Sequence, residues 1–147
     1  MRHTFSSGIF ASCLAASGMS IAQELPQADA DLGLEDVQIR EKQRAEYGSR
    51  VRGTLPSGAR IEIDLDQDGM IEDIEARGND LFPVADIQSL IATTITENSM
   101  WPADAQLEEI EFERDGIVDI EGRLANGNEF DASFAADGRL LDFDTDD

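Results

Sequence analysis

The stretch Gly58–Ala76, GARIEIDLDQDGMIEDIEA, decides the fold because a second version of it closes the chain. This second version is Gly127–Thr145, GNEFDASFAADGRLLDFDT, which aligns with the first without a gap. Upstream, Val51–Leu55 lies over Ile120–Leu124 at the same spacing. Two similar segments at a fixed offset in one chain indicate a duplicated structural unit.

Apolar and polar residues alternate in both copies, and this period of two predicts β-strands. Each copy has a three-residue loop that ends in glycine, at residues 56–58 and 125–127, which is typical of a β-hairpin. The loop length fixes which residues lie opposite one another and puts the apolar residues on one face. It pairs Val51 with Ile63, Gly53 with Ile61 and Gly122 with Phe130.

On the other face, the same register predicts opposite-charge pairs in the first copy and an almost purely acidic face in the second. It pairs Arg52 with Glu62, Arg50 with Asp64, Glu121 with Asp131 and Asp119 with Ser133. An opposite-charge pair across two strands contributes roughly 0.2–1 kcal/mol. Residues 40–60 are the only locally basic region, and we expect them to neutralise the protein's own acidic strands.

Each copy also has an Asp-Gly pair, at residues 68–69 and 137–138, which favours a hairpin turn between the third and fourth strands. A loop of two or four residues would point the apolar side chains of the fourth strand inward. These side chains are Met70 and Ile74 in the first copy and Leu141 and Phe143 in the second. The sequence does not decide between the two loop lengths.

Between the copies, apolar residues recur at helical spacing after Pro83, a residue suited to a first helical turn. The β-branched run at residues 91–96 lowers helix propensity, so this helix needs a sheet to pack on. We therefore predict an α+β fold of two tandem four-stranded antiparallel β-meanders, at residues 34–76 and 77–147, with one helix at about residues 84–98 packed on the sheet. If the meanders join edge to edge, the helix covers one side and leaves the charged side open.

Residues 1–22 have the pattern of a secretory signal peptide, with small residues Ser20 and Ala22 before the cleavage position. The apolar stretch is short and broken by glycine and serine, which disfavours a membrane anchor. Residues 10–13 match a lipoprotein signal poorly. We expect the mature chain to be periplasmic or secreted, to begin with a linker at residues 23–33, and not to insert into a membrane.

Removal of this segment takes away His3 and Cys13, the only histidine and cysteine. The mature chain then lacks an imidazole base, a thiol nucleophile and nitrogen or sulfur metal ligands, so we expect neither an enzyme nor a resident cofactor. The net charge of −21 becomes −22 because Arg2 also leaves. Such a charge disfavours nucleic acid as a partner and suits cations or a basic protein.

A proline-led helix followed by a four-stranded meander resembles a PepSY-type unit. The residues that carry the resemblance are Leu81–Ile87, Val118–Glu121, Glu129–Ala132 and Phe134–Leu140. Two tandem copies are similar to the PepSY-like, β-lactamase-inhibitor-like group, although the first copy matches in its strands and lacks a matching helix. The resemblance implies an exported binding module with a protein partner, which inhibits or regulates an envelope enzyme such as a peptidase, without catalytic residues.

Residues 64–75 fit the pattern of a calcium loop, which we call the candidate calcium loop. Its predicted ligands are Asp64, Asp66, Asp68, the carbonyl of Met70, Glu72 through a water, and Glu75. Calcium (Ca²⁺) binding is therefore the alternative function. The flanking residues alternate like strands, however, and the second copy keeps only the turn, so a plain acidic hairpin explains the same residues.

Overall fold

The computed structural model describes residues 31–43 and 47–146. The predicted signal peptide and most of the predicted linker lie outside these ranges. The described strands are β1 (Glu35–Glu41), β2 (Ser49–Thr54), β3 (Arg60–Leu65), β4 (Ile71–Ala76), β5 (Phe82–Pro83), β6 (Gln106–Phe112), β7 (Val118–Arg123), β8 (Glu129–Phe134) and β9 (Leu140–Asp146). Between β5 and β6 lie α2 (Val84–Ile87), the 3₁₀ turn η1 (Gln88–Leu90) and α3 (Thr93–Thr96).

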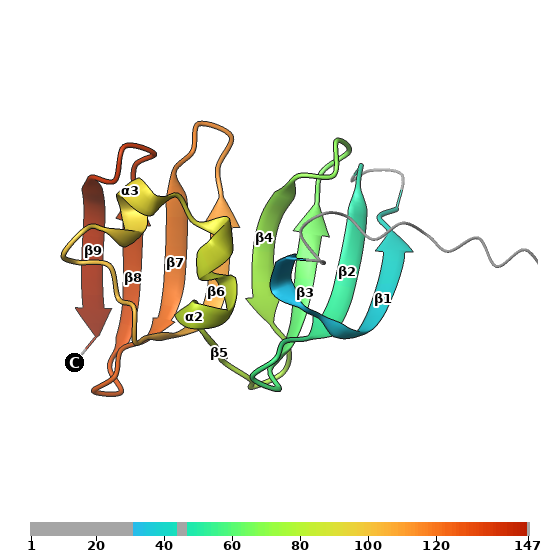
Figure 1. The fold of residues 1–147 in the computed structure, drawn as a ribbon, viewed down its shortest axis with the longest axis horizontal. Coiled ribbons are helices and arrows are strands. Elements are labelled where there is room, and N and C mark those ends of the chain that lie inside the picture. The colour runs from blue at the N-terminus through green and yellow to red at the C-terminus, as the bar shows by residue number, and fades with distance from the viewer. Residues whose placement is uncertain (1–30, 44–46, 147) are drawn as a thin grey trace, which may run out of the picture.

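The strands form one antiparallel sheet in the order β1-β2-β3-β4-β6-β7-β8-β9, with β5 paired to β6 (Figure 1). Both halves are four-stranded meanders, as predicted. They join edge to edge through β4 and β6, where Asp73, Ile74 and Glu75 pair with Glu111, Ile110 and Glu109. The joined sheet has one apolar face and one charged face.

The helical segments lie over the apolar face of the second half, with α2 near β6 and α3 near β8 (Figure 1). Ile87, Ile95 and Trp101 are at most 7% exposed there, and the ring of Trp101 packs edge-on against Phe134 at 5.4 Å. In the first half, Leu32 from the turn at residues 31–33 is 3% exposed and belongs to the same core. The described part of the first unit thus contributes a single turn.

The predicted helix at residues 84–98 is shorter than expected. It divides into α2, η1 and α3, because Ile91 and Ala92 adopt extended backbone angles between η1 and α3. The β-branched run at residues 91–96, which lowers helix propensity, begins at this break. Pro83 belongs to β5, which pairs with β6, and is the N-cap of α2.

The register that the three-residue loops predict is confirmed in both halves. Val51 lies opposite Ile63, Gly53 opposite Ile61, and Gly122 opposite Phe130. On the other face, the predicted pairs of Arg50 and Arg52 with Asp64 and Glu62 are also present.

The prediction of an even loop between the third and fourth strands is wrong. Asp66 and Ala135 each donate a backbone hydrogen bond across a three-residue loop, to Met70 at 2.9 Å and Arg139 at 2.8 Å. A bulge then shifts each register by one residue, after Leu65–Ile71 and after Phe134–Leu140. As a result, Met70 is 66% exposed and Leu141 is 47% exposed, whereas Ile74 is buried and Phe143 stacks on Phe130.

Candidate functional site: the charged face of the sheet

Two rows of side chains cross the whole charged face, perpendicular to the strands. The first row is Arg40, Arg50, Asp64, Asp73, Glu111, Asp119, Ser133 and Asp142. The second row is Gln38, Arg52, Glu62, Glu75, Glu109, Glu121, Asp131 and Asp144. Each residue lies directly opposite the next in a paired strand, so neighbouring charges interact with one another.

Opposite charges face each other between β2 and β3 in both rows. Arg50 donates to the two oxygens of Asp64 at 2.8 and 3.1 Å, and Arg52 donates to Glu62. The carboxyl pKa of Asp64 is lowered because its hydrogen bonds to Arg50 and Lys42 outweigh the opposing effect of burial. The expectation that residues 40–60 neutralise the protein's own acidic strands is confirmed for these pairs.

Carboxylates dominate the remainder of the rows, and we call these residues the acidic face. They are Asp73, Glu75, Glu109, Glu111, Asp119, Glu121, Asp131, Asp142 and Asp144. Burial, followed by repulsion from Glu75 and other neighbours, raises the pKa of Glu109 to about 7. Burial and repulsion from Asp64 raise the pKa of Asp73 to about 6, and burial followed by repulsion from Asp131 raises that of Glu121. These side chains would be stabilised by any cation placed among them.

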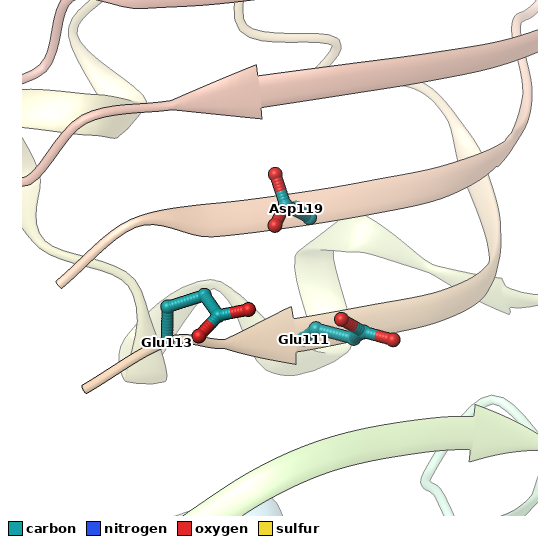
Figure 2. Close-up of side chains that lie close together, drawn as sticks. All are labelled: Glu111, Glu113 and Asp119. Carbon is teal, nitrogen blue, oxygen red and sulfur yellow. The ribbon is translucent and has the colours of Figure 1, made fainter. Parts of the chain in front are cut away.

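Three carboxylates at one end of the acidic face come close to one another (Figure 2). Glu111 and Glu113 extend from the end of β6, and Asp119 extends from β7, with one oxygen of each within 4.8 Å of the others. Ser133 donates its hydroxyl hydrogen to Asp119. Oxygen atoms of this kind are suitable ligands for a hard divalent cation.

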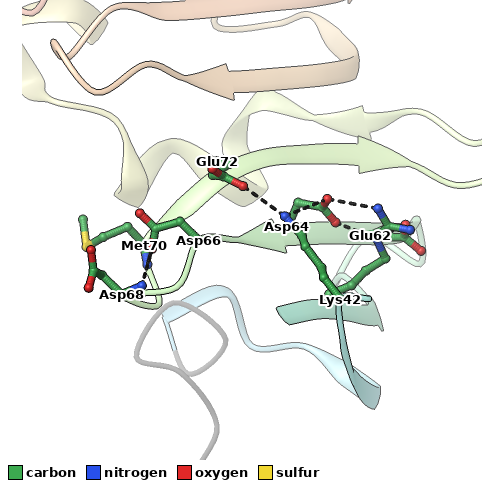
Figure 3. A network of polar contacts seen from close by, with 8 residues as sticks. Lys42, Glu62, Asp64, Asp66, Asp68, Met70 and Glu72 are labelled. Atoms are coloured by element: carbon green, nitrogen blue, oxygen red, sulfur yellow. Dashed lines mark hydrogen bonds and ion pairs between the residues drawn. The ribbon is translucent and has the colours of Figure 1, made fainter. Parts of the chain in front are cut away.

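The candidate calcium loop does not gather its predicted ligands in one place. Asp64 and Glu72 instead hold the Nζ of Lys42, at 3.1 and 3.0 Å, and the Lys42 side chain is 7% exposed (Figure 3). Asp66 accepts hydrogen bonds from the backbone N–H groups of Asp68 and Met70, at 2.8 and 2.9 Å. This arrangement is an Asx turn, which closes a hairpin without a metal.

Three predicted ligands remain: Asp68 is exposed at the tip of the hairpin, and the other two take part in strand structure. The carbonyl of Met70 accepts the backbone hydrogen bond of Asp66, and Glu75 lies opposite Glu62 in the pairing of β4 with β3. Calcium binding by residues 64–75 stays a prediction. The hairpin geometry itself follows from the turn residues.

A hollow of about 820 Å³ lies between the β3–β4 hairpin and the β6–β7 hairpin, and we call it the junction groove. Residues of segments 66–73 and 111–115 line it. Pairing between β4 and β6 ends at Asp73–Glu111, although β4 begins at Ile71 and β6 continues to Phe112. The two halves therefore part at this end of the sheet and leave the groove between them.

The groove combines exposed apolar surface with carboxylates. Its apolar side chains are Met70, Ile71 and Phe112, of which Met70 is 66% exposed. Seven of the other lining residues are aspartate or glutamate, and Arg114 is the one basic residue among those that line it. Sequence reasoning missed this groove because it depends on which strands of the two copies pair.

No protein-family model matches the sequence, and no curated protein matches it either. A solved structure from Bacteroides vulgatus matches the fold with a TM-score of 0.46 and 19% sequence identity, over 82% of this chain and 90% of the other. Its description gives the DUF2874 family and a provisional assignment to the periplasm. Among the described residues, no helix has the length and apolar character needed to cross a bilayer.

Proposed function

We propose that this protein is an exported, PepSY-like binding module that holds a basic protein partner on the acidic face of its sheet. The observation that carries the proposal is the pair of side-chain rows, in which the β6–β9 half contributes seven carboxylates and no basic residue. Aligned like charges destabilise a sheet, so the carboxylates of this face repel one another, and a nearby cation would reduce that repulsion. A basic partner would remove that repulsion and gain affinity from doing so.

Export and a non-catalytic role belong to the same proposal. The signal-like segment at residues 1–22 supports a periplasmic location, and the mature chain that it implies has neither histidine nor cysteine. An inhibitor or regulator of an envelope enzyme, such as a peptidase, would need only a complementary surface. The acidic face supplies such a surface on rigid paired strands rather than on loops.

The proposal can be tested with a variant that neutralises the centre of the acidic face. Glu109→Gln, Glu121→Gln and Asp131→Asn remove three charges from adjacent strands and keep the side-chain size. Crosslinking in the intact envelope should capture a basic protein with the natural chain and lose it with this variant. A captured set that is unchanged in the variant, or the absence of any captured protein, would refute the proposal.

Calcium binding is the second candidate function, because residues 64–75 match the loop pattern at each ligand position. Its direct test is a calcium titration of the natural chain and of Asp64→Ala/Asp68→Ala. An isotherm that the double substitution leaves unchanged would exclude this loop as the site.

A further inference from the structure

The hairpin tips of the two copies have different surroundings. In the second copy, α3 and the residues after it cover the β8–β9 tip: Thr94 donates to the carbonyl of Ala136 at 3.1 Å, and Asn98 donates to that of Gly138 at 2.7 Å. A Cβ atom on Gly138 would lie 2.0 Å from the carbonyl oxygen of Thr94. At the equivalent Gly69, no described atom lies within 4 Å of such a Cβ atom. Among the described residues, the β3–β4 tip is thus open where its counterpart is covered.

Met70 follows this open tip and points an apolar side chain into the junction groove. Its 66% exposure contrasts with the buried apolar residues of the neighbouring strands. Ile71 and Phe112, both partly buried, extend the apolar lining to either side of the gap between β4 and β6. A volume of about 820 Å³ is within the range that holds a ligand larger than one side chain.

We propose that the junction groove is the docking site for an extended basic segment of a partner protein, in which apolar residues alternate with lysine or arginine. The inference rests on the proposed function and specifies which part of the partner is recognised. In an extended segment, alternate side chains point to opposite sides. Apolar side chains would then cover Met70, Ile71 and Phe112, while the basic side chains reach the carboxylates of the rim.

The apolar lining distinguishes this partner from a small cation. A metal ion would use the carboxylates Asp68 and Glu113 but would gain nothing from Met70. A basic segment without apolar residues would bind anywhere along the acidic face. The dependence of binding on Met70 is therefore the property that separates a specific docking groove from general charge attraction.

The test uses protein purified after export and two fluorescein-labelled heptapeptides of equal charge, Lys-Leu-Lys-Phe-Lys-Leu-Lys and Lys-Gly-Lys-Gly-Lys-Gly-Lys. Fluorescence anisotropy measures their affinity, with spermine and calcium chloride as competitors. The groove variant is Asp68→Asn/Met70→Ser/Glu113→Gln. Its matched control lies between α3 and β6, outside the acidic face and the junction groove, and is Glu97→Gln/Met100→Ser/Asp104→Asn, which removes the same charge and also one exposed apolar side chain.

We expect the leucine-containing peptide to bind the natural chain about tenfold more tightly than the glycine-containing peptide, because only the former fills the apolar lining. The groove variant should lose this difference, and the control variant should stay within about twofold of the natural chain. Equal affinity for the two peptides, or equal losses in the two variants, would overturn the proposal. The proposal would also be overturned if spermine or calcium displaced both peptides equally well from the natural chain and from the groove variant, because this would indicate a site for small cations.

The result also separates the groove from the wider acidic face. Binding that is lost in Glu109→Gln/Glu121→Gln/Asp131→Asn and kept in the groove variant would reject the groove and leave the proposed function intact. Loss of both peptide binding and envelope capture in the groove variant, with capture unchanged in Glu109→Gln/Glu121→Gln/Asp131→Asn, would support the groove and reject the acidic face as the main surface.

Discussion

Glu109 and Glu121 lie directly opposite each other in the pairing of β6 with β7, and Glu75 lies opposite Glu109 on its other side. Three glutamates on adjacent strands thus share one row. Burial and this repulsion raise the pKa of Glu109 from 4.5 to about 7. Between these two pH values, Glu109 is therefore protonated in the folded chain and ionised in the unfolded chain.

The melting temperature should therefore be higher at pH 5 than at pH 8. A carboxyl group whose pKa is raised by folding contributes stability at low pH. The protein loses this contribution as pH rises from the group's unfolded pKa to its folded pKa. The raised pKa values of Asp73 and Glu121 act in the same direction. The lowered pKa values of Asp64, Asp80 and Asp137 change the stability only at pH values below the usual aspartate pKa of 3.8, which lies outside this window. Calorimetry at several pH values measures the slope.

Glu109→Gln should make that slope shallower, because it removes the most strongly shifted carboxyl group. Asp104→Asn, at an exposed position before β6, is the control and should leave the slope unchanged. A melting temperature that is constant or falls between pH 8 and pH 5 would contradict the account of the acidic face.

Lys42 should contribute more to stability than an exposed basic residue. Its Nζ contacts Asp64 and Glu72 on two strands, and its side chain is 7% exposed. Lys42→Met keeps the aliphatic stem and leaves Glu72 without this contact, so we expect a loss of about 1–2 kcal/mol in the free energy of unfolding. Urea denaturation measures the loss.

The matched control is Arg60→Met. Arg60 pairs with Asp80 at 2.8 Å, but its side chain is 59% exposed, so its removal should lower the free energy of unfolding by less than Lys42→Met does. Equal losses in the two variants would show that the Lys42 contacts act as an ordinary surface ion pair.

The register of the β2–β3 and β7–β8 hairpins could be predicted because the loop has a glycine at a fixed place and the residues on each face alternate. Gly58 and Gly127 have φ values of 91° and 92°, which the loop requires. The charged rows on the outer face follow directly from that register. Within each hairpin, therefore, the sequence contains enough information to place the charges.

The two bulges and the interruption of the helix were not predictable in the same way. A bulge adds one residue to a strand without a distinctive residue type, so the exposure of Met70 and Leu141 depends on pairing that alternation alone does not reveal. The junction of β4 with β6 brings residues of different copies together. The junction groove and the acidic face across the junction are consequences of this contact.

Gly122 is in a strand where alanine would not fit. A Cβ atom there would lie 2.2 Å from the carbonyl oxygen of Gln106 and 2.8 Å from the Cα of Leu107, both in β6. Gly122→Ala should therefore push β6 away from β7 and destabilise the fold by about 1–3 kcal/mol or more. Gly127→Ala is a useful comparison, because its strain would come from a φ of 92°, with no non-neighbouring atom of the described residues within 4 Å of the added Cβ atom. Retention of full stability in Gly122→Ala would contradict the close approach of these strands.

Divalent cations should stabilise the protein without discriminating between calcium and magnesium. Asp64 and Glu72 already hold Lys42, and Asp66 closes the turn, so the candidate calcium loop does not present a preformed set of oxygens. Either cation would instead reduce repulsion across the acidic face, and the melting temperatures in millimolar calcium and magnesium should exceed that in EGTA by similar amounts. A specific site would behave differently, because a ligand at a hundredfold excess over its dissociation constant stabilises the folded state by about 2.7 kcal/mol. A calcium-specific rise that disappears in Asp64→Ala/Asp68→Ala would establish the loop as a site. A rise that disappears only in Glu111→Gln/Asp119→Asn would assign the binding to the three carboxylates of β6 and β7.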